Sequence, residues 1–339
     1  MISRMSNQAR SLNNTRILAE SGLKKYFSTE SKEDMFTDIA SAIPIKLEDS
    51  KLTSKSINQF FEDGFLVIDD VFSKDEAENL KNMADIEINK AQKLGELDWP
   101  LHRLCATRST QFRNLCSDKR LIEILKPIVG ENIQLQHSKF AIKQPGEEKG
   151  IINWHQDFAF FPHTNDSLVA IAISLNDVTP ENGGMVMIKG SHKEGLLNHR
   201  YADGTFAEKC LDEKILTEKE RFHWVCPKQG SISIHHCLTA HCSNDNLTSD
   251  TRYMVVFEYR ASDAYQLADG IWDDTGLQVN GKSVENIRIG GRFLKKSSDD
   301  SIILPLPRSD RYGSEFPFGH AYNQVGKLGK ESSPYFKKS

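Results

Sequence analysis

Short segments rich in β-branched and aromatic residues, separated by turn signals, fill the chain after Gly130 and constrain its fold more than any other feature. Before Gly130, apolar residues recur at helical spacing instead. Helices followed by many short strands predict helices packed against a β-sandwich or barrel. The expected strands after Gly130 cover residues 133–142, 168–175, 185–188, 231–236 and 252–259.

The helical part carries start and stop signals. Gly64 stands where the C-cap of a first helix belongs. Ser73 and Glu76 have the spacing of a capping box, in which each side chain satisfies the backbone N–H of the other residue. Pro127 and Gly130 close a third helix. The expected helices run over 54–63, over 74–94 and onward from 117–118, with a strand at 65–68 after the first.

Changes in composition divide the chain into parts. Residues 29–52 are polar and charged, and we interpret them as a linker. Residues 53–310 form the predicted domain, in which residues 181–184 predict a hairpin turn between two strands. The pattern weakens after residue 261, and residues 311–339 predict an irregular basic tail.

Composition excludes several classes of function. The chain has 339 residues, and 43 basic against 47 acidic side chains give a net charge of −4, which disfavours binding to nucleic-acid phosphates or anionic lipid. No stretch approaches 18 consecutive apolar residues, which argues against a membrane span. Six cysteines without a C-x-x-C pair argue against a disulfide framework and a zinc ribbon. We expect a small-molecule partner, and the oligomeric state stays open.

The first 28 residues have the composition of a mitochondrial transit peptide. They contain five Arg or Lys against one acid, Glu20, and are rich in Ser and Asn. We expect cleavage near residues 26–31 and a mitochondrial location. The same composition fits a disordered N-terminus, with a peroxisomal or cytoplasmic protein as the alternative.

One pattern of residues carries chemistry. His155 and Asp157 are two residues apart, so on a strand or extended loop they project to the same side. His241 follows about 85 residues later, and Arg252 then opens an apolar strand. A His-x-carboxylate pair with one distant His is the facial triad of non-haem Fe(II) oxygenases. Arg252 would offer a bidentate partner to a carboxylate and would face the same side as Met254.

Other interpretations of these histidines stay open. His155 and Asp157 could instead be a hydrogen-bonded loop histidine and a turn-capping carboxylate. His235 and His236 compete with His241 for the third ligand position, and one of the pair must point inward. His192 and Glu194 form a rival pair, for which a helix start or a loop is the stronger interpretation. Three further histidines fit surface or substrate-pocket positions: His163, His199 and His223.

Several motifs between residues 57 and 260 occur in the order of a known family. They are Phe61-Glu62-Asp63-Gly64-Phe65-Leu66-Val67-Ile68, Trp154-His155-Gln156-Asp157 with Phe161-Pro162, Asp177-Val178-Thr179-Pro180-Glu181-Asn182-Gly183-Gly184, Gly190-Ser191-His192-Lys193, and His235-His236 with His241, Asn246 and Arg252. Together these motifs resemble the phytanoyl-CoA dioxygenase family of Fe(II)/2-oxoglutarate oxygenases.

The resemblance implies a mainly β fold with a double-stranded β-helix (jelly-roll) core and flanking N-terminal helices. It implies that Fe(II) is bound by the triad and that Arg252 holds the distal carboxylate of 2-oxoglutarate. Dioxygen is then the co-substrate, and ascorbate is a further candidate cofactor. Arg103 and Lys139 fall where further co-substrate contacts are expected, although Lys139 departs from the usual residue type. Ile173 departs likewise at an aromatic position. The ligands implied for Fe(II) are His155, Asp157 and His241.

The activity implied is hydroxylation of an unactivated C–H bond. We expect a fatty acyl-CoA or a related hydrophobic acid as substrate. The same chemistry on another small metabolite, of amino-acid or alkaloid type, is an alternative. A non-catalytic jelly-roll binding protein, a structural metal protein and a cupin-type isomerase or dioxygenase that does not use 2-oxoglutarate are further alternatives. Apolar residues that would shield the reaction from water are Trp154, Phe158, Phe160 and Phe161.

Overall fold

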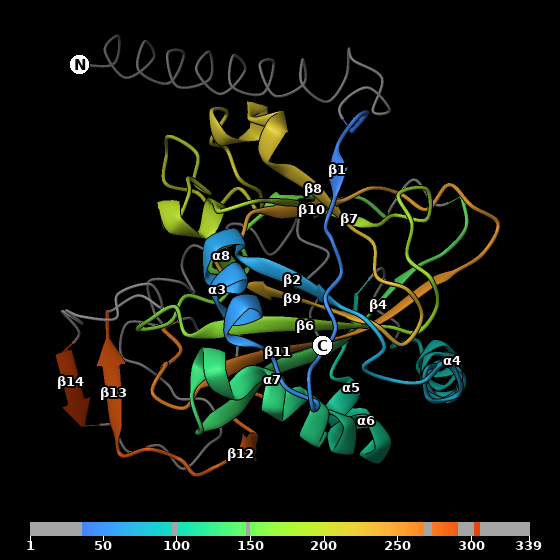
Figure 1. The fold of residues 1–339 in the computed structure, drawn as a ribbon, viewed down its shortest axis with the longest axis horizontal. Coiled ribbons are helices and arrows are strands. Elements are labelled where there is room, and N and C mark those ends of the chain that lie inside the picture. Colours follow the sequence, from blue (N-terminus) through green and yellow to red (C-terminus); the bar gives the residue numbers. More distant parts are fainter. Residues whose placement is uncertain (1–35, 97–100, 147–149, 268–272, 291–301, 306–339) are drawn as a thin grey trace, which may run out of the picture.

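In the computed structural model of the chain, two mostly antiparallel β-sheets face each other (Figure 1). They enclose a pocket that residues of both sheets line. The structure describes residues 36–96, 101–146, 150–267, 273–290 and 302–305. The predicted mainly β jelly-roll core with flanking helices is confirmed. The candidate transit peptide and the candidate basic tail lie outside the described residues.

The larger sheet has seven strands and forms the base of the pocket. Its strand order is β12-β4-β11-β6-β9-β2, and β3 pairs with β4 outside that path. The bounds are β2 Phe65–Ile68, β3 Leu101–Arg103, β4 Ile133–Lys143, β6 Leu168–Ser174, β9 Ile232–His236, β11 Arg252–Ala261 and β12 Gln278–Asn280. Four of the five predicted strands appear in this sheet as β4, β6, β9 and β11, and the fifth is β7 (Met185–Ile188) of the smaller sheet; their ends differ by no more than about two residues.

The smaller sheet covers the other side of the pocket. Its strand order is β1-β8-β7-β10-β5, and β1 runs parallel to β8. The bounds are β1 Ala40–Ser41, β5 Ile152–His155, β7 Met185–Ile188, β8 Phe222–Val225 and β10 His241–Ser243. A helix of one turn, α8 Asp157–Phe160, follows β5 almost directly. A third pairing joins β13 Asn286–Ile289 to β14 Ile302–Pro305, in the part of the chain where the sequence pattern is weak.

Alternation along β11 explains why one strand serves both the core and the pocket. Val255, Phe257 and Tyr259 point to the outer face of the larger sheet and are fully buried there. Met254 and Val256 point the other way and line the pocket. Because side chains alternate across a strand, a buried central strand can hold an apolar face and a functional face at the same time.

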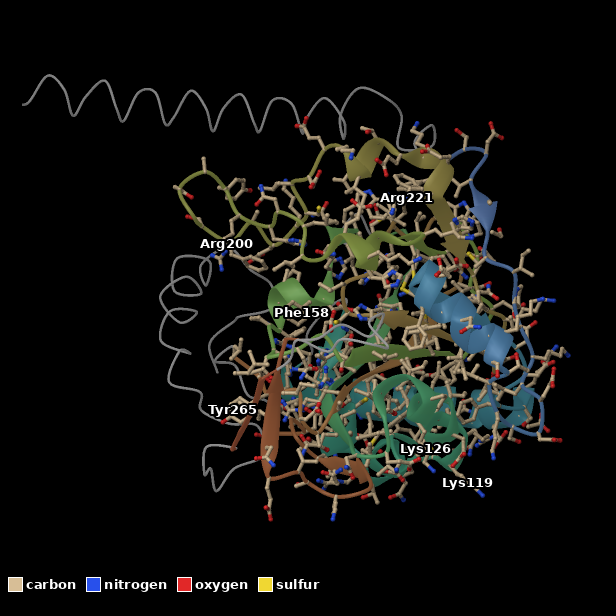
Figure 2. All side chains as sticks on the ribbon, turned by 60° about the vertical axis from the view of Figure 1, so that its left-hand side comes forward. Lys119, Lys126, Phe158, Arg200, Arg221 and Tyr265 are labelled. Carbon is tan, nitrogen blue, oxygen red and sulfur yellow. The ribbon has the colours of Figure 1, made fainter. Side chains whose placement is uncertain are left out.

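Helices cover the outer face of the larger sheet, away from the smaller sheet (Figure 1). Their bounds are α3 Ser54–Asp63, α4 Lys74–Leu94, α5 Cys105–Arg108, α6 Thr110–Leu115 and α7 Lys119–Val129. The predicted capping box begins α4, since the Ser73 side chain accepts from Glu76 N and the Glu76 side chain accepts from Ser73 N. Figure 2 labels Lys119 and Lys126 on the outer side of α7. The helices therefore bury one face only.

Two expectations differ from the structure. The segment 181–184 is not a hairpin turn, because β6 and β7 on its two sides belong to different sheets. The described part of the expected linker, residues 36–52, packs on the domain: Ile45 forms a bridge with Ile68 and Leu52 is buried. Isolated apolar residues within this polar segment make these contacts. The average composition of the segment does not reveal them, because most of its residues are polar.

Two smaller expectations concern α7 and the membrane. The helix continues past Pro127 and ends at Val129, and the N–H of Gly130 bonds Lys126 O as a cap. Within the described ranges, no helix has the length and apolar character needed to cross a bilayer.

Candidate metal centre and active site

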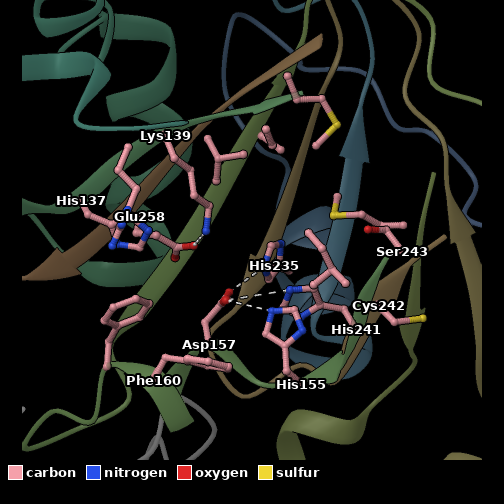
Figure 3. A pocket seen from close by; sticks show the side chains of 18 of the residues that line it. His137, Lys139, His155, Asp157, Phe160, His235, His241, Cys242, Ser243 and Glu258 are labelled. Carbon is pink, nitrogen blue, oxygen red and sulfur yellow. Dashed lines mark hydrogen bonds and ion pairs between the residues drawn. The ribbon is translucent and has the colours of Figure 1, made fainter. Parts of the chain in front are cut away.

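The three predicted ligands come together at one end of the pocket (Figure 3). His155 ends β5, Asp157 begins α8, and His241 begins β10. Because β10 pairs with β5 so that His241 lies opposite His155, the sheet itself holds these two residues side by side. One ligand atom from each of the three residues lies within 4.8 Å of the others. No other group of this kind occurs among the described residues.

The distances suit a divalent metal ion. Asp157 Oδ1 lies 3.5 Å from His155 Nε2 and 3.9 Å from His241 Nε2. Metal bonds of about 2 Å place neighbouring ligands about 3 Å apart, so a small inward movement would complete the contact. Two imidazoles and one carboxylate on one side leave the opposite side open to the pocket, as in facial-triad iron sites.

Backbone carbonyls orient both imidazoles. His155 Nδ1 lies 2.8 Å from Asn153 O, and His241 Nδ1 lies 2.9 Å from Thr239 O. When Nδ1 carries the proton and donates to a carbonyl, Nε2 keeps its lone pair for a metal. Burial lowers the pKa of His241 well below its ordinary value, with His155 as the next cause. The neutral form that binds metals is therefore favoured.

Asp157 is held by His235, for which the sequence left two roles open: a rival ligand, or an inward-pointing residue that supports the site or the core. His235 Nε2 lies 3.0 Å from Asp157 Oδ2, the oxygen that does not face the other two ligands. Burial favours the neutral acid, but His241, His155 and His235 hold the pKa of Asp157 well below its usual range. The carboxylate is thus ionised and oriented by a partner, as ligating carboxylates usually are.

Gln156 fixes the short link between His155 and Asp157. It is fully buried, and its Nε2 donates to Gly195 O at 2.9 Å and to Leu238 O at 2.7 Å. Its Oε1 accepts from Leu197 N at 2.8 Å. The Gln156 side chain therefore ties the ligand segment to two loops. No spacing rule identifies this role of Gln156 from the sequence.

Arg252 lies in the same pocket and is 1% exposed. Its Nη1 donates to Gly183 O, whereas its Nε has no hydrogen-bond acceptor among the described residues. Burial lowers the pKa of Arg252 to about 10, so the guanidinium stays charged at neutral pH. A buried guanidinium with an unsatisfied N–H fits a carboxylate ligand.

A buried lysine supports this end of the pocket. Lys143 Nζ donates to Ser243 Oγ at 2.8 Å and to Asn244 O. Ser243 also lines the pocket. Because its oxygen already accepts from Lys143, its own O–H is directed to a further acceptor. Neither Lys143 nor Ser243 was predicted from the sequence.

Arg103 and Lys139 line the pocket further from Arg252. The pairing of β3 with β4 places Arg103 opposite Lys139. Lys139 Nζ lies 3.6 Å from Glu258 Oε1 on the neighbouring strand β11. Figure 3 shows Lys139, Glu258 and His137 on the wall that faces the three ligands. Glu258 and His137 were not predicted from the sequence.

The remaining histidines have structural positions. His236 faces away from the pocket and packs on His192, with ring centroids 5.3 Å apart. His192 lies in the 3₁₀ turn Ser191–Glu194, as expected for a helix start, and its Nε2 contacts Phe61 O. His163 and His199 are buried, which corrects the expectation of surface or pocket positions. His163 contacts Arg260, and His199 Nε2 accepts from Gln156 N.

Two expectations about apolar residues need correction. Ile173 packs in the core under the helices and does not line the pocket, whereas its neighbour Ala172 does. Phe160 and Phe161 do line the pocket. Trp154 points to the outer face of the smaller sheet, and Phe158, labelled in Figure 2, packs against the main core.

Comparison with known proteins gives an independent line of information. Residues 60–254 match the family model described as phytanoyl-CoA dioxygenase (PhyH). The protein named "Probable alpha-ketoglutarate-dependent hypophosphite dioxygenase" of Stutzerimonas stutzeri is 32% identical over 181 residues, which cover 50% of this chain and 60% of that protein. The peroxisomal phytanoyl-CoA dioxygenase of Homo sapiens is 24% identical over 71% of this chain and 75% of that protein.

Solved structures share the fold. EctD from S. alaskensis with bound Fe has a TM-score of 0.54 at 21% identity and covers 67% of this chain and 82% of that chain. EctD with 2-oxoglutarate and 5-hydroxyectoine has a TM-score of 0.53, also at 21% identity, with coverages of 68% and 85%. The family model spans more than half of the sequence, and the His-Asp-His group lies within it. The chain therefore belongs to the phytanoyl-CoA dioxygenase family of iron- and 2-oxoglutarate-dependent oxygenases, as its motifs predicted.

Proposed function

We propose that this chain is an Fe(II)- and 2-oxoglutarate-dependent dioxygenase that hydroxylates a C–H bond of a small molecule. The observation that carries the proposal is the shared pocket of His155, Asp157, His241 and the buried Arg252. A cupin-type isomerase or dioxygenase without 2-oxoglutarate would need the metal ligands alone, whereas the unsatisfied guanidinium of Arg252 calls for a carboxylate.

The residues divide the work of binding. His155, Asp157 and His241 would hold Fe(II), and Arg252 would bind the distal carboxylate of 2-oxoglutarate through a bidentate contact. Ser243, whose oxygen accepts from Lys143, would donate its O–H to the same carboxylate. The resemblance implied Arg103 and Lys139 as further co-substrate contacts, and both line the part of the pocket that lies away from Arg252. The metal with 2-oxoglutarate and dioxygen supplies the oxidising power, and the products are succinate, carbon dioxide and the hydroxylated substrate.

The chain's own contribution is orientation and exclusion of water. His235 holds the second oxygen of Asp157, so the carboxylate presents its first oxygen to the metal position. Phe160 and Phe161 line the pocket on the side of α8. Apolar walls lower the local dielectric and keep water from the reacting atoms. Met254 and Val256 add apolar surface from β11.

The experiment that tests the proposal is coupled turnover. Purified protein loaded with Fe(II) should consume 2-oxoglutarate and dioxygen and release succinate, faster with its substrate than without it. Oxygen uptake and succinate formation measured over a panel of acyl-CoA esters, free acids and amino acids check this. No consumption under any condition would contradict the proposal and favour a non-catalytic jelly-roll binding protein.

Substrate and location stay predictions. A fatty acyl-CoA or a related hydrophobic acid is the substrate that the resemblance implies, and relatives carry the names of quite different substrates. For location, the human relative is named as peroxisomal, which agrees with the alternative to a mitochondrial protein. N-terminal sequencing of protein isolated from cells, with fractionation of organelles, distinguishes these locations.

A further inference from the structure

The pocket-facing side chains of the larger sheet change character along its two central strands. On β11 they run from Arg252 through Met254 and Val256 to Glu258. Six residues separate Arg252 from Glu258, which is about 20 Å at about 3.4 Å per residue. A five-carbon dicarboxylate held by Arg252 is much shorter than this distance. A co-substrate held by Arg252 would therefore not reach the polar groups at the Glu258 end.

That end of the pocket holds an ion pair with little contact to water. The Lys139 and Glu258 side chains are 15% and 5% exposed, and their charged atoms are 3.6 Å apart. A buried ion pair contributes little net stability compared with apolar side chains of the same size. Ala141 and Val256 at neighbouring pocket-facing positions show that apolar residues fit this wall. Folding stability therefore does not explain why a lysine and a glutamate occupy these two positions.

Two basic side chains line the Glu258 end of the pocket. Arg103 lies opposite Lys139 on the adjoining strand and lines the same pocket. Burial, with Asp157 as the next cause, raises the pKa of Glu258 to about 8 even though Lys139 lowers it. The carboxyl of Glu258 therefore takes up a proton more readily than an ordinary glutamate, and its protonated form can donate a hydrogen bond. Two basic side chains beside such a group suit the acidic group of a ligand.

The geometry points to a recognition site for the acidic group of a compact oxyanion substrate, a carboxylate or a phosphorus oxyacid, formed by Lys139 with Arg103 and Glu258. This inference rests on the proposed function and names its substrate class. The acidic group would sit against Lys139, and the rest of the substrate would extend between the apolar residues towards the three metal ligands. Lys139, expected from the sequence as a co-substrate contact, is thereby assigned to the substrate.

The size of the pocket favours a compact molecule. The cavity between the two walls has a volume of about 100 Å³. A protein cavity of about 150 Å³ holds a single benzene molecule. A long acyl chain with its CoA group is far larger than this space.

The test is calorimetric titration of the full chain loaded with Ni(II), which cannot support turnover, with 2-oxoglutarate present. The ligands are butyrate, hexanoate and propylphosphonate, with the matched amides, alanine and octanoyl-CoA for comparison. We expect the acids to bind saturably and the amides to bind at least about tenfold more weakly, because charge-assisted hydrogen bonds are lost.

A pair of variants links the binding to the proposed residues. The double variant Lys139→Met with Glu258→Gln removes both charges and leaves no buried charge unpaired. We expect it to weaken acid binding by roughly 10- to 100-fold while the affinities for Ni(II) and 2-oxoglutarate stay the same. Glu258→Gln alone should bind acids at least as tightly as the parent chain. Lys46→Met with Asp70→Asn, which removes an exposed ion pair of 2.7 Å, is the matched control.

Several results would overturn the inference. These are equal binding of acids and amides, unchanged acid binding in the double variant, binding of alanine without binding of simple acids, or binding of octanoyl-CoA alone. The proposed function fails separately, because absence of 2-oxoglutarate consumption by the Fe(II)-loaded chain contradicts it. The acid titration needs no turnover, so it gives its answer in either case.

Discussion

The two walls of the pocket hold their functional side chains in different ways. The smaller sheet presents His155 and His241 from strands of four and three residues. A hydrogen bond to a backbone carbonyl two residues earlier in the chain holds each imidazole. The larger sheet presents Lys139 and Glu258 from strands of eleven and ten residues. There, the register of long paired strands decides which side chains reach the pocket.

This difference predicts different consequences of mutation. A metal ligand that local backbone contacts hold in place cannot be replaced by a neighbouring residue. Its mutation should therefore abolish metal binding completely. The charged wall is a set of groups that act on one ligand through electrostatics, so each change should have a graded effect. Arg252 lies between these cases, because it is on a long strand and also bonds a backbone carbonyl, that of Gly183. The following predictions test this contrast.

The largest expected effect is that of His155→Ala on metal binding. Loss of an outer partner of a ligand typically lowers metal affinity by about 10- to 100-fold, and loss of a ligand itself should exceed this. We expect no measurable Fe(II) binding in calorimetry or dialysis, and no 2-oxoglutarate consumption. His223→Ala is the matched control, because His223 Nδ1 also contacts a carbonyl two residues earlier, that of Arg221, yet lies outside the metal group. Retained iron binding in His155→Ala would place the metal elsewhere.

The metal centre was largely predictable from the sequence, for a physical reason. A facial triad needs few residue types at short spacing, and His155 and Asp157 are close in the chain. The distant ligand was harder, since His235 and His241 both fit. The sequence could not decide between them because the choice depends on which strand lies next to β5. The structure places His241 opposite His155 and leaves His235 to bond Asp157.

The charged wall was predicted only in part: Arg103 and Lys139 were selected from the sequence, whereas His137 was missed because alternation along β4 is interrupted just before it. Glu258 pairs with His137, and the next residue, Tyr259, pairs with Leu135, so Gln136 is an extra residue on β4. Such a β-bulge reverses which face the side chains point to. Leu135 therefore packs in the core while His137 lines the pocket, although both have odd numbers. A simple period of two along the segment cannot reveal this switch.

The second prediction concerns Arg252→Lys, which keeps the charge and loses the bidentate geometry. We expect the apparent constant for 2-oxoglutarate to rise by roughly 10- to 100-fold, the value of one or two charge-assisted hydrogen bonds. Fe(II) affinity should not change, because Arg252 is not among the three ligands. Kinetics with varied 2-oxoglutarate, beside metal titration, measure both quantities. Normal co-substrate kinetics would show that Arg252 is structural.

The third prediction uses Gly183, whose carbonyl accepts from Arg252. Its φ is +84°, and a Cβ atom there would lie 2.6 Å from Lys143 Cδ and 2.7 Å from Asn244 O. Gly183→Ala should therefore lower the free energy of unfolding by about 1–3 kcal/mol. Because the strain falls beside Arg252, 2-oxoglutarate affinity should drop while Fe(II) affinity is retained. Denaturant unfolding and co-substrate titration check this. Gly204→Ala, with a similar φ but open space around it, is the control for backbone strain.

The smallest expected effect is a dependence on pH that comes from Glu258. Burial raises its pKa to about 8, so the neutral acid is the form that the folded protein favours. The stability that this group contributes is present below the carboxyl pKa of the unfolded chain, near 4.3, and is lost as pH rises towards 8. The titratable and charged groups that line the pocket around it are Lys139 and His137 on β4, Arg103 on β3, Asp157 on α8 and His235 on β9.

Binding of an acid should follow the same titration. Above pH 8 the ionised Glu258 places a negative charge beside the ligand, and the affinity for hexanoate should fall by up to about tenfold between pH 6.5 and 9. Hexanoate keeps its charge throughout this range, so the change belongs to the protein. The Glu258→Gln variant should show a flat profile, because an amide does not titrate here. A profile that falls equally in both proteins would assign the pH dependence to another group. A flat profile in both would show that Glu258 does not act on the ligand.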